Sequence, residues 1–121
     1  MNIEKVNISE AFTKISTYWD PKIAGALNDQ YVKLAKFKDT FPWHKHDDED
    51  EMFLVIEGEF TMEFRDRKIE LKPNEFLIVP KGVEHRPVAL NEASVLLFEP
   101  KSTLNTGDST NDFTKHKLDT I

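Results

Sequence analysis

The 121-residue sequence contains no cysteine. This absence excludes a disulfide framework, a cysteine nucleophile and any metal site built on thiolate ligands. A metal site in this chain would therefore have to use imidazole nitrogens and oxygen atoms. Glycine is also scarce: the four glycines are scattered at positions 25, 58, 82 and 107, which excludes a glycine-rich phosphate-binding loop.

The sequence also lacks a basic excess and a long apolar run. Its 22 acidic residues outnumber 16 basic residues, so we expect no nucleic-acid partner. No apolar stretch approaches a membrane span, and the N-terminus has no signal-peptide pattern, so we expect no membrane association and a cytoplasmic location. The length predicts a single domain over residues 1–121, with a core at about 21–100 and a C-terminal extension at 101–121.

Turn residues divide most of the chain into short segments rich in β-branched and aromatic residues. The predicted strands are 21–27, 31–38, 51–58, 59–67, 69–71, 76–80, 86–90 and 94–100. This spacing, without crossover helices, favours an all-β sandwich or barrel over a parallel α/β sheet. One short helix is expected at 9–17, with Ser9 as its N-cap.

Two of the four histidines, His44 and His46, are two residues apart and precede an acidic run. On an extended segment both imidazoles leave the same face, so they can converge on one metal ion. Glu51 opens the next predicted strand after a loop that can reset the strand parity, and it can therefore turn inward as a carboxylate ligand. His85 supplies a fourth ligand if the turn before it delivers the side chain to the same cavity.

These residues carry a resemblance to the cupin superfamily. "HKHDDEDEMFLVIEG" is similar to the first cupin motif (H-x-H, three or four residues, E, six residues, G), with Gly58 in register. "PKGVEH" is similar to the core of the second motif, P-x-G-x-x-H. The departures are Lys38 and Asn74, where the motifs open with glycine, and Ala89, where the second motif ends in asparagine. Asn74 can replace a glycine where φ is positive.

The resemblance implies a cupin double-stranded β-helix (a jelly-roll barrel) with a short N-terminal helix and a polar C-terminal tail. The chain looks most like the small single-domain, RmlC-like cupins described as mannose-6-phosphate-isomerase-like. It implies one divalent transition metal, namely Zn, Fe, Mn, Ni or Cu, held by His44, His46, Glu51 and His85. It also implies a homodimer, to which we expect residues 1–20 and the strand 21–27 to contribute.

The residues leave the function open. One hypothesis is a metal-dependent isomerase or dioxygenase acting on a small oxygen-rich molecule, and the other is a non-catalytic metal or small-molecule binding or sensing module. The alternative to a metal site is a degenerate cupin, in which the histidines would only form hydrogen bonds in a polar cavity. No catalytic acid or base is singled out among the candidates Tyr31, Glu57, Glu63 and Glu84. The basic side chains Arg65, Arg67, Lys81 and Arg86 could bind an anion, but we expect them to decorate turns, and we expect the acidic loop 47–50 to face solvent.

Overall fold

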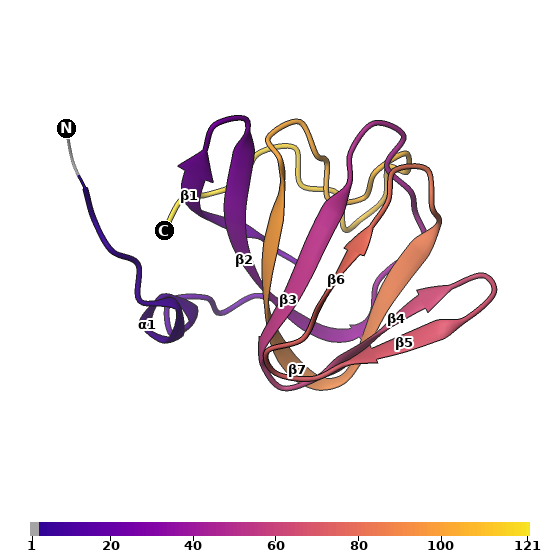
Figure 1. The fold of residues 1–121 in the computed structure, drawn as a ribbon, viewed down its shortest axis with the longest axis horizontal. Helices are drawn as coiled ribbons and strands as arrows, with labels where there is room; N and C mark the ends of the chain where they lie inside the picture. Colours follow the sequence, from indigo (N-terminus) through magenta and orange to yellow (C-terminus); the bar gives the residue numbers. More distant parts are fainter. Residues whose placement is uncertain (1–2) are drawn as a thin grey trace.

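The structure, a computed structural model, describes residues 3–121 and is built mostly of antiparallel β-strands (Figure 1). Its elements are α1 (Ile8–Phe12), β1 (Lys22–Leu27), β2 (Gln30–Thr40), β3 (Glu51–Glu57), β4 (Phe60–Phe64), β5 (Lys68–Leu71), β6 (Phe76–Val79) and β7 (His85–Pro100). The predicted all-β fold class is confirmed. Residues 1 and 2, which belong to the predicted domain and to the predicted dimer segment, lie outside the described residues.

The longest strand, β7, organises the sheet. It pairs with β4 through residues 85–88, with β3 through residues 94–98, and with β2 through residues 88–100. The prediction of two separate strands at 86–90 and 94–100 is wrong, because the polar residues between them stay extended within β7. Asn91 and Glu92 are exposed at the point where the strand passes from its pairing with β4 to its pairing with β3, so their polarity marks a bend and not a break.

Alternation along the strands separates an inner and an outer apolar cluster. The inner cluster includes Phe37, Phe53 and Val95, with Trp19 packed against them from the segment before β1. The outer cluster contains Leu34 and Leu96, covered by the N-terminal segment around α1, which lies outside the sheet (Figure 1). In β3 the residues that face the inner cluster are fully buried and the residues that face the outer cluster are half-buried.

The N-terminal helix is shorter than predicted and has a different cap. Asn7, and not Ser9, is the N-cap: its Oδ1 accepts a hydrogen bond from the Glu10 N–H at 2.9 Å. The helix ends at Phe12, where the Thr13 hydroxyl donates to the Glu10 carbonyl at 2.6 Å. Ile15 is buried after the helix has ended, so the apolar spacing that predicted a helix to residue 17 reflects a turn. No helix within residues 3–121 is long and apolar enough to span a membrane.

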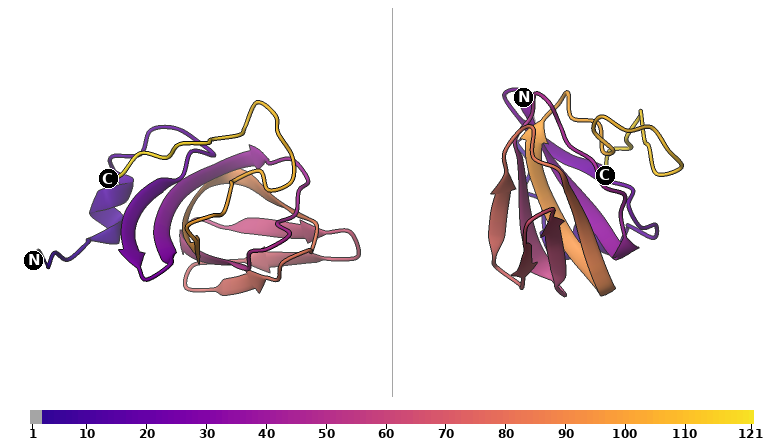
Figure 2. Two further views of the ribbon diagram at one scale, coloured as in Figure 1. Left: turned by 90° about the horizontal axis from the view of Figure 1, so that it is seen from above. Right: turned by 90° about the vertical axis from the view of Figure 1, so that its right-hand side faces the viewer.

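The C-terminal segment after β7 packs against the end of the barrel and returns to β1. Figure 2 shows it passing over the strands, and Thr120 pairs with Ile23 in a parallel bridge. The Phe113 ring packs on Phe41 of the inner cluster, with 5.3 Å between ring centroids. The Asp108 N–H donates to the Lys45 carbonyl at 2.9 Å, beside His44. The C-terminal segment therefore contacts both the inner cluster and the segment that carries His44.

Two turns depend on a positive φ angle. Gly58 has φ +76°, and Asn74, predicted to replace a motif glycine, has φ +70°. A Cβ atom added to Gly58 would also collide with the backbone carbonyl oxygen of Glu92 in β7. The turn between β3 and β4 therefore packs directly on the bend of β7.

We expect Gly58→Ala to lower the free energy of unfolding by about 2 kcal/mol or more, because it combines left-handed strain with a backbone clash. Denaturant unfolding measures this loss. Gly25→Ala is the matched control: Gly25 has no atom within 4 Å of an added Cβ, so its effect should stay within about 0.5 kcal/mol. Equal effects of the two substitutions would contradict this account of the turn.

Candidate metal centre

The structure brings His44, His46, Glu51 and His85 into one buried cluster. Each side chain offers one potential ligand atom, and these four atoms all lie within 4.8 Å of one another. The exposed fractions of the four residues are between 0 and 5%. The fourth histidine, His116, is exposed in the C-terminal segment.

Backbone pairing holds the two histidine segments side by side. The His44 N–H donates to the His85 carbonyl at 3.1 Å, and the His85 N–H donates back to the His44 carbonyl at 2.9 Å. The Gly82 N–H donates to the His46 carbonyl at 2.7 Å. Glu51 begins β3 and pairs with Val79 of β6, the strand that leads into the turn before His85. Main-chain hydrogen bonds thus hold these residues, which are distant in sequence, close enough for their side chains to form one cluster.

The acidic loop between His46 and Glu51 is mostly solvent-facing, as predicted, with one exception. Asp47, Asp48 and Asp50 are exposed, and the Asp50 carboxylate accepts a hydrogen bond from the Lys81 N–H at 2.8 Å. This bond ties the loop to the turn that carries His85. Glu49 is the exception: its side chain is 16% exposed, and its Oε1 lies 4.0 Å from His46 Nδ1.

Two of the imidazoles are oriented by backbone carbonyls. Nδ1 of His44 lies 2.9 Å from the Pro42 carbonyl oxygen, and Nδ1 of His85 lies 2.9 Å from the Val83 carbonyl oxygen. Since a carbonyl oxygen can only accept a hydrogen bond, Nδ1 carries the proton in both rings. The Nε2 lone pair then points into the cluster, which is the usual arrangement of a metal-ligating histidine.

The inward-facing atoms of the cluster have no directed hydrogen-bond partner. Glu51 Oε1 lies 2.8 Å from His46 Nε2 and 3.2 Å from His85 Nε2, yet none of these three buried atoms makes a well-aligned hydrogen bond. At His85 a lone pair faces a carboxylate oxygen, which is unfavourable unless a cation lies between them. Two atoms bound to one ion with bonds of about 2.1 Å are about 3.0–3.4 Å apart. The distance to His85 lies within this range and the distance to His46 just below it, so the cluster is close to the spacing of a shared metal ion.

The pKa values follow from burial and from the short contacts. Burial, with a smaller contribution from His85, lowers the pKa of His44 to about 4. Burial alone would raise the pKa of Glu51, but the imidazoles of His46 and His85, in the forms that carry a proton on Nε2, outweigh it and hold this pKa well below its usual range. Glu51 is therefore ionised and His44 neutral at pH 7, as metal binding requires, whereas the hydrogen bond to Glu51 raises the pKa of His46, whose proton a metal ion would have to displace.

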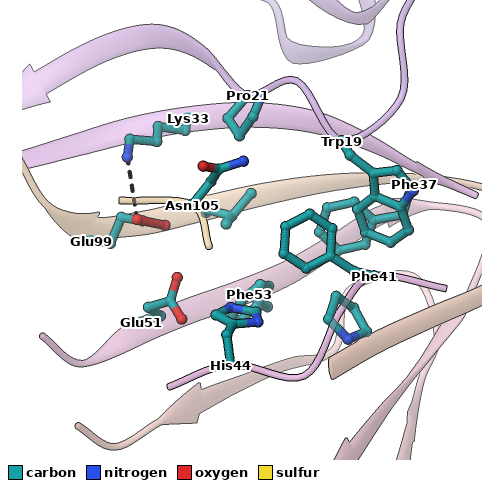
Figure 3. A pocket seen from close by; sticks show the side chains of 12 residues that line it. Trp19, Pro21, Lys33, Phe37, Phe41, His44, Glu51, Phe53, Glu99 and Asn105 are labelled. Carbon is teal, nitrogen blue, oxygen red and sulfur yellow. Dashed lines mark hydrogen bonds and ion pairs between the residues drawn. The ribbon is translucent and has the colours of Figure 1, made fainter. Parts of the chain in front are cut away.

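A small cavity of about 40 Å³ adjoins the cluster (Figure 3). His44 and Glu51 lie at one end of it, with Lys33 and Glu99 on the neighbouring wall. Its other walls are apolar and largely aromatic, formed by Trp19, Pro21, Phe37, Phe41, Phe53, Pro87 and Leu97, and Asn105 of the C-terminal segment also lines it. This volume holds a few water molecules or a ligand of a few heavy atoms.

Two charged residues of this wall, Lys33 and Glu99, were not predicted from the sequence. Lys33 and Glu99 are 3% and 2% exposed and form an ion pair at 3.2 Å. The acid–base candidates named from the sequence (Tyr31, Glu57, Glu63 and Glu84) are not among the residues that line the cavity. The alternation of side chains along β2 could have revealed Lys33, because it lies on the same face of the strand as Ala35 and Phe37, which are both buried in the inner cluster.

Residues 30–99 match the family model for the cupin domain. This chain belongs to the cupin family. The matched region contains all four clustered residues and both sequence motifs.

The matches to similar proteins cover different fractions of this chain. A cupin-2 domain protein from Shewanella frigidimarina is 38% identical and superposes with a TM-score of 0.78 over 79% of this chain and 94% of its own. Protein NMB1881 from Neisseria meningitidis is 29% identical, with a TM-score of 0.75 over 81% of this chain and 100% of its own. The uncharacterized protein YdbB of Bacillus subtilis (strain 168) is 46% identical over 61 residues, which are 50% of this chain and 54% of YdbB. The match thus spans about half the length of this curated relative.

In the presence of a chelator, we expect the protein to lose about 2 kcal/mol of stability between pH 6.5 and 4.5. Because the pKa of His44 falls from 6.5 to about 4 on folding, the unfolded chain takes up the proton first, and stability is lost as the pH falls through this window. The pKa of His46 is raised on folding, so its contribution to stability is lost as the pH rises above 6.5 and does not oppose the loss at lower pH. Denaturant unfolding at several pH values tests this, and His44→Gln should flatten the slope; an unchanged slope would refute the assignment.

Proposed function

We propose that this cupin binds one divalent transition metal ion through His44, His46, Glu51 and His85. The observation that carries the proposal is the convergence of buried Nε2 and Oε1 atoms that have no other directed partner. Three imidazoles and one carboxylate suit Zn, Fe, Mn, Ni or Cu. The backbone carbonyls behind His44 and His85 support the proposal, because they hold both rings in the ligating tautomer.

The metal would act on, or hold, a small oxygen-bearing molecule in the adjoining cavity. When bound, it supplies Lewis-acid or oxygen-activating chemistry, as in a metal-dependent isomerase or dioxygenase. The chain's own contribution is to keep Glu51 ionised and to exclude bulk water with the aromatic walls around Phe37 and Phe53. A six-coordinate ion would leave two positions for the molecule, whereas tetrahedral zinc would be closed by the four residues.

The second candidate is a non-catalytic metal-binding module. The small volume of the cavity, about 40 Å³, favours it, because a sugar-sized substrate does not fit without rearrangement. Oxygen uptake and sugar-phosphate isomerisation by the metal-loaded protein separate the two candidates, and the second assay also tests membership of the mannose-6-phosphate-isomerase-like subgroup. Turnover that Glu51→Gln abolishes supports an enzyme; ligand-induced melting shifts without turnover support the binding module.

We expect His46→Ala and His85→Ala each to weaken metal binding by about tenfold or more, because each removes one ligand and opens the buried cluster. Elemental analysis after equilibration with metal, together with calorimetric titration, measures the loss. His116→Ala is the matched control, since His116 is exposed in the C-terminal segment and should leave metal content unchanged. Full metal content in a His46→Ala, His85→Ala double variant would refute the site.

We further propose a homodimer formed through the outer face of the sheet. Two rows of apolar residues cross this face from β2 through β7 and β3 to the edge strand β6: Val32, Phe98, Met52 and Ile78, and beside them Leu34, Leu96, Leu54 and Phe76. The N-terminal segment packs on the β2 end of these rows. At the β6 end Phe76 and Ile78 are 60% and 56% exposed, which is costly in a monomer and supports pairing with a second copy.

We expect light scattering to give the mass of two chains, and Phe76→Lys with Ile78→Lys to give the mass of one, because two charges would be buried without partners. Leu90→Lys is the control: Leu90 is 87% exposed at the bend of β7, away from these rows. A monomeric wild-type protein would disprove the dimer.

A further inference from the structure

We propose that Lys33 forms an anion-binding subsite beside the metal centre, and that the ligand of this cupin is a small carboxylate held between the Lys33 ammonium and the metal. This inference rests on the metal site proposed above and adds to it the chemical class of the ligand and a residue that orients it.

Lys33 is placed on the inner wall of the barrel and not on its surface. It lies on β2 opposite Leu97 of β7, is 3% exposed, and lines the same cavity as His44 and Glu51 (Figure 3). It is the only lysine or arginine among the described residues that line this cavity. Two of the arginines that the sequence suggested for anion binding are engaged elsewhere: Arg65 and Arg86 lie over the Trp43 ring, at 3.9 and 4.9 Å from its centroid.

The ammonium of Lys33 retains unused hydrogen-bonding capacity, although it also faces the Tyr31 ring at 5.9 Å from its centroid. It donates to Glu99 Oε2 at 3.2 Å and makes a long contact of 3.5 Å with the Thr103 carbonyl. An ammonium has three N–H groups, so one donor is left without a partner among the described residues. A carboxylate oxygen in the cavity could accept it as a charge-assisted hydrogen bond.

Stability alone does not account for the pair formed by Lys33 and Glu99. Both residues are almost completely buried, and a buried ion pair is often no more stabilising than two apolar side chains of similar volume. The surrounding wall is apolar, so two apolar side chains would pack there without the desolvation penalty that two buried charges carry. A role in ligand binding explains why charged groups occupy this position.

The charge of the metal-loaded site also favours an anion. Burial, with a smaller contribution from Glu51, raises the pKa of Glu99 to about 8. Whether Glu99 is protonated or ionised, the two positive charges of the ion and the one of Lys33 exceed the negative charge of the two carboxyl groups, provided the histidines stay neutral. At least one positive charge then remains in a desolvated pocket, which an anion neutralises and a neutral ligand does not. The volume of about 40 Å³ limits the anion to a few heavy atoms, the size range of formate and acetate.

Titration of the Co²⁺-loaded protein with acetate and with its neutral analogue acetamide tests the subsite. The visible spectrum of Co²⁺ reports first whether the metal is bound and then whether the probe reaches it. For the wild type we expect saturable acetate binding and acetamide binding about tenfold weaker or more, because only acetate makes the charge-assisted contact.

The informative variant is the double substitution Lys33→Met, Glu99→Met. It removes both charges together and leaves no buried charge unpaired, so it should fold and retain Co²⁺ while its acetate affinity falls about tenfold or more. Lys36→Met is the matched control: Lys36 lies on the same strand but pairs with Glu92 outside the cavity, and acetate affinity should be unchanged.

The outcomes separate the two proposals. A missing Co²⁺ spectrum in the wild type refutes the metal site, and the subsite with it. A normal Co²⁺ spectrum overturns the subsite alone if acetate fails to bind, if acetamide binds as tightly as acetate, or if the double variant keeps wild-type acetate affinity. Loss of acetate binding in the double variant, with an intact Co²⁺ spectrum and an unaffected Lys36→Met control, supports it.

Discussion

The reciprocal backbone pairing of His44 and His85 is the constraint on which the rest of the site depends. Two main-chain hydrogen bonds, of 3.1 and 2.9 Å, join a segment that precedes β3 to the first residue of β7. Because the backbones are locked, their imidazoles have to share one small space, with ring centroids 4.3 Å apart. His46 and Glu51 are then brought in by the same segment and by the strand that follows it.

Interactions outside the cluster reinforce this pairing. The Trp43 ring, next to His44, contacts the guanidinium groups of Arg65 from the β4–β5 hairpin and of Arg86, which follows His85. Cation–π contacts of this kind stabilise by about 0.5–1 kcal/mol at partly exposed positions. From the other side, the C-terminal segment packs on Phe41 and hydrogen-bonds to Lys45. The histidine segment is therefore held on both sides, although it forms little regular strand of its own.

Two different signals in the sequence point to the cluster. Two histidines at a spacing of two share a face of any extended segment, which is a local property. Glu51 and His85 were assigned only from the spacing of the family motifs, because their approach depends on long-range backbone pairing. Lys33 and Glu99 escaped prediction because their meeting depends on the register between β2 and β7, strands separated by most of the chain. The helix end and the continuity of β7 were wrong for a related reason: tertiary contacts, and not local pattern, decide where those elements stop.

The surroundings of the cluster explain why metal binding and folding should be coupled. Glu51 is ionised and buried against imidazole nitrogens, beside a largely aromatic wall that excludes water. In such a low-dielectric setting, acceptor atoms that face one another repel strongly, and a cation among them converts that repulsion into attraction. The unfolded chain offers no comparable site, so the free energy of binding a metal ion at this cluster would add to the stability of the folded state. The polar cluster, which weakens the apolar core of the metal-free barrel, then becomes a point that holds its three segments together.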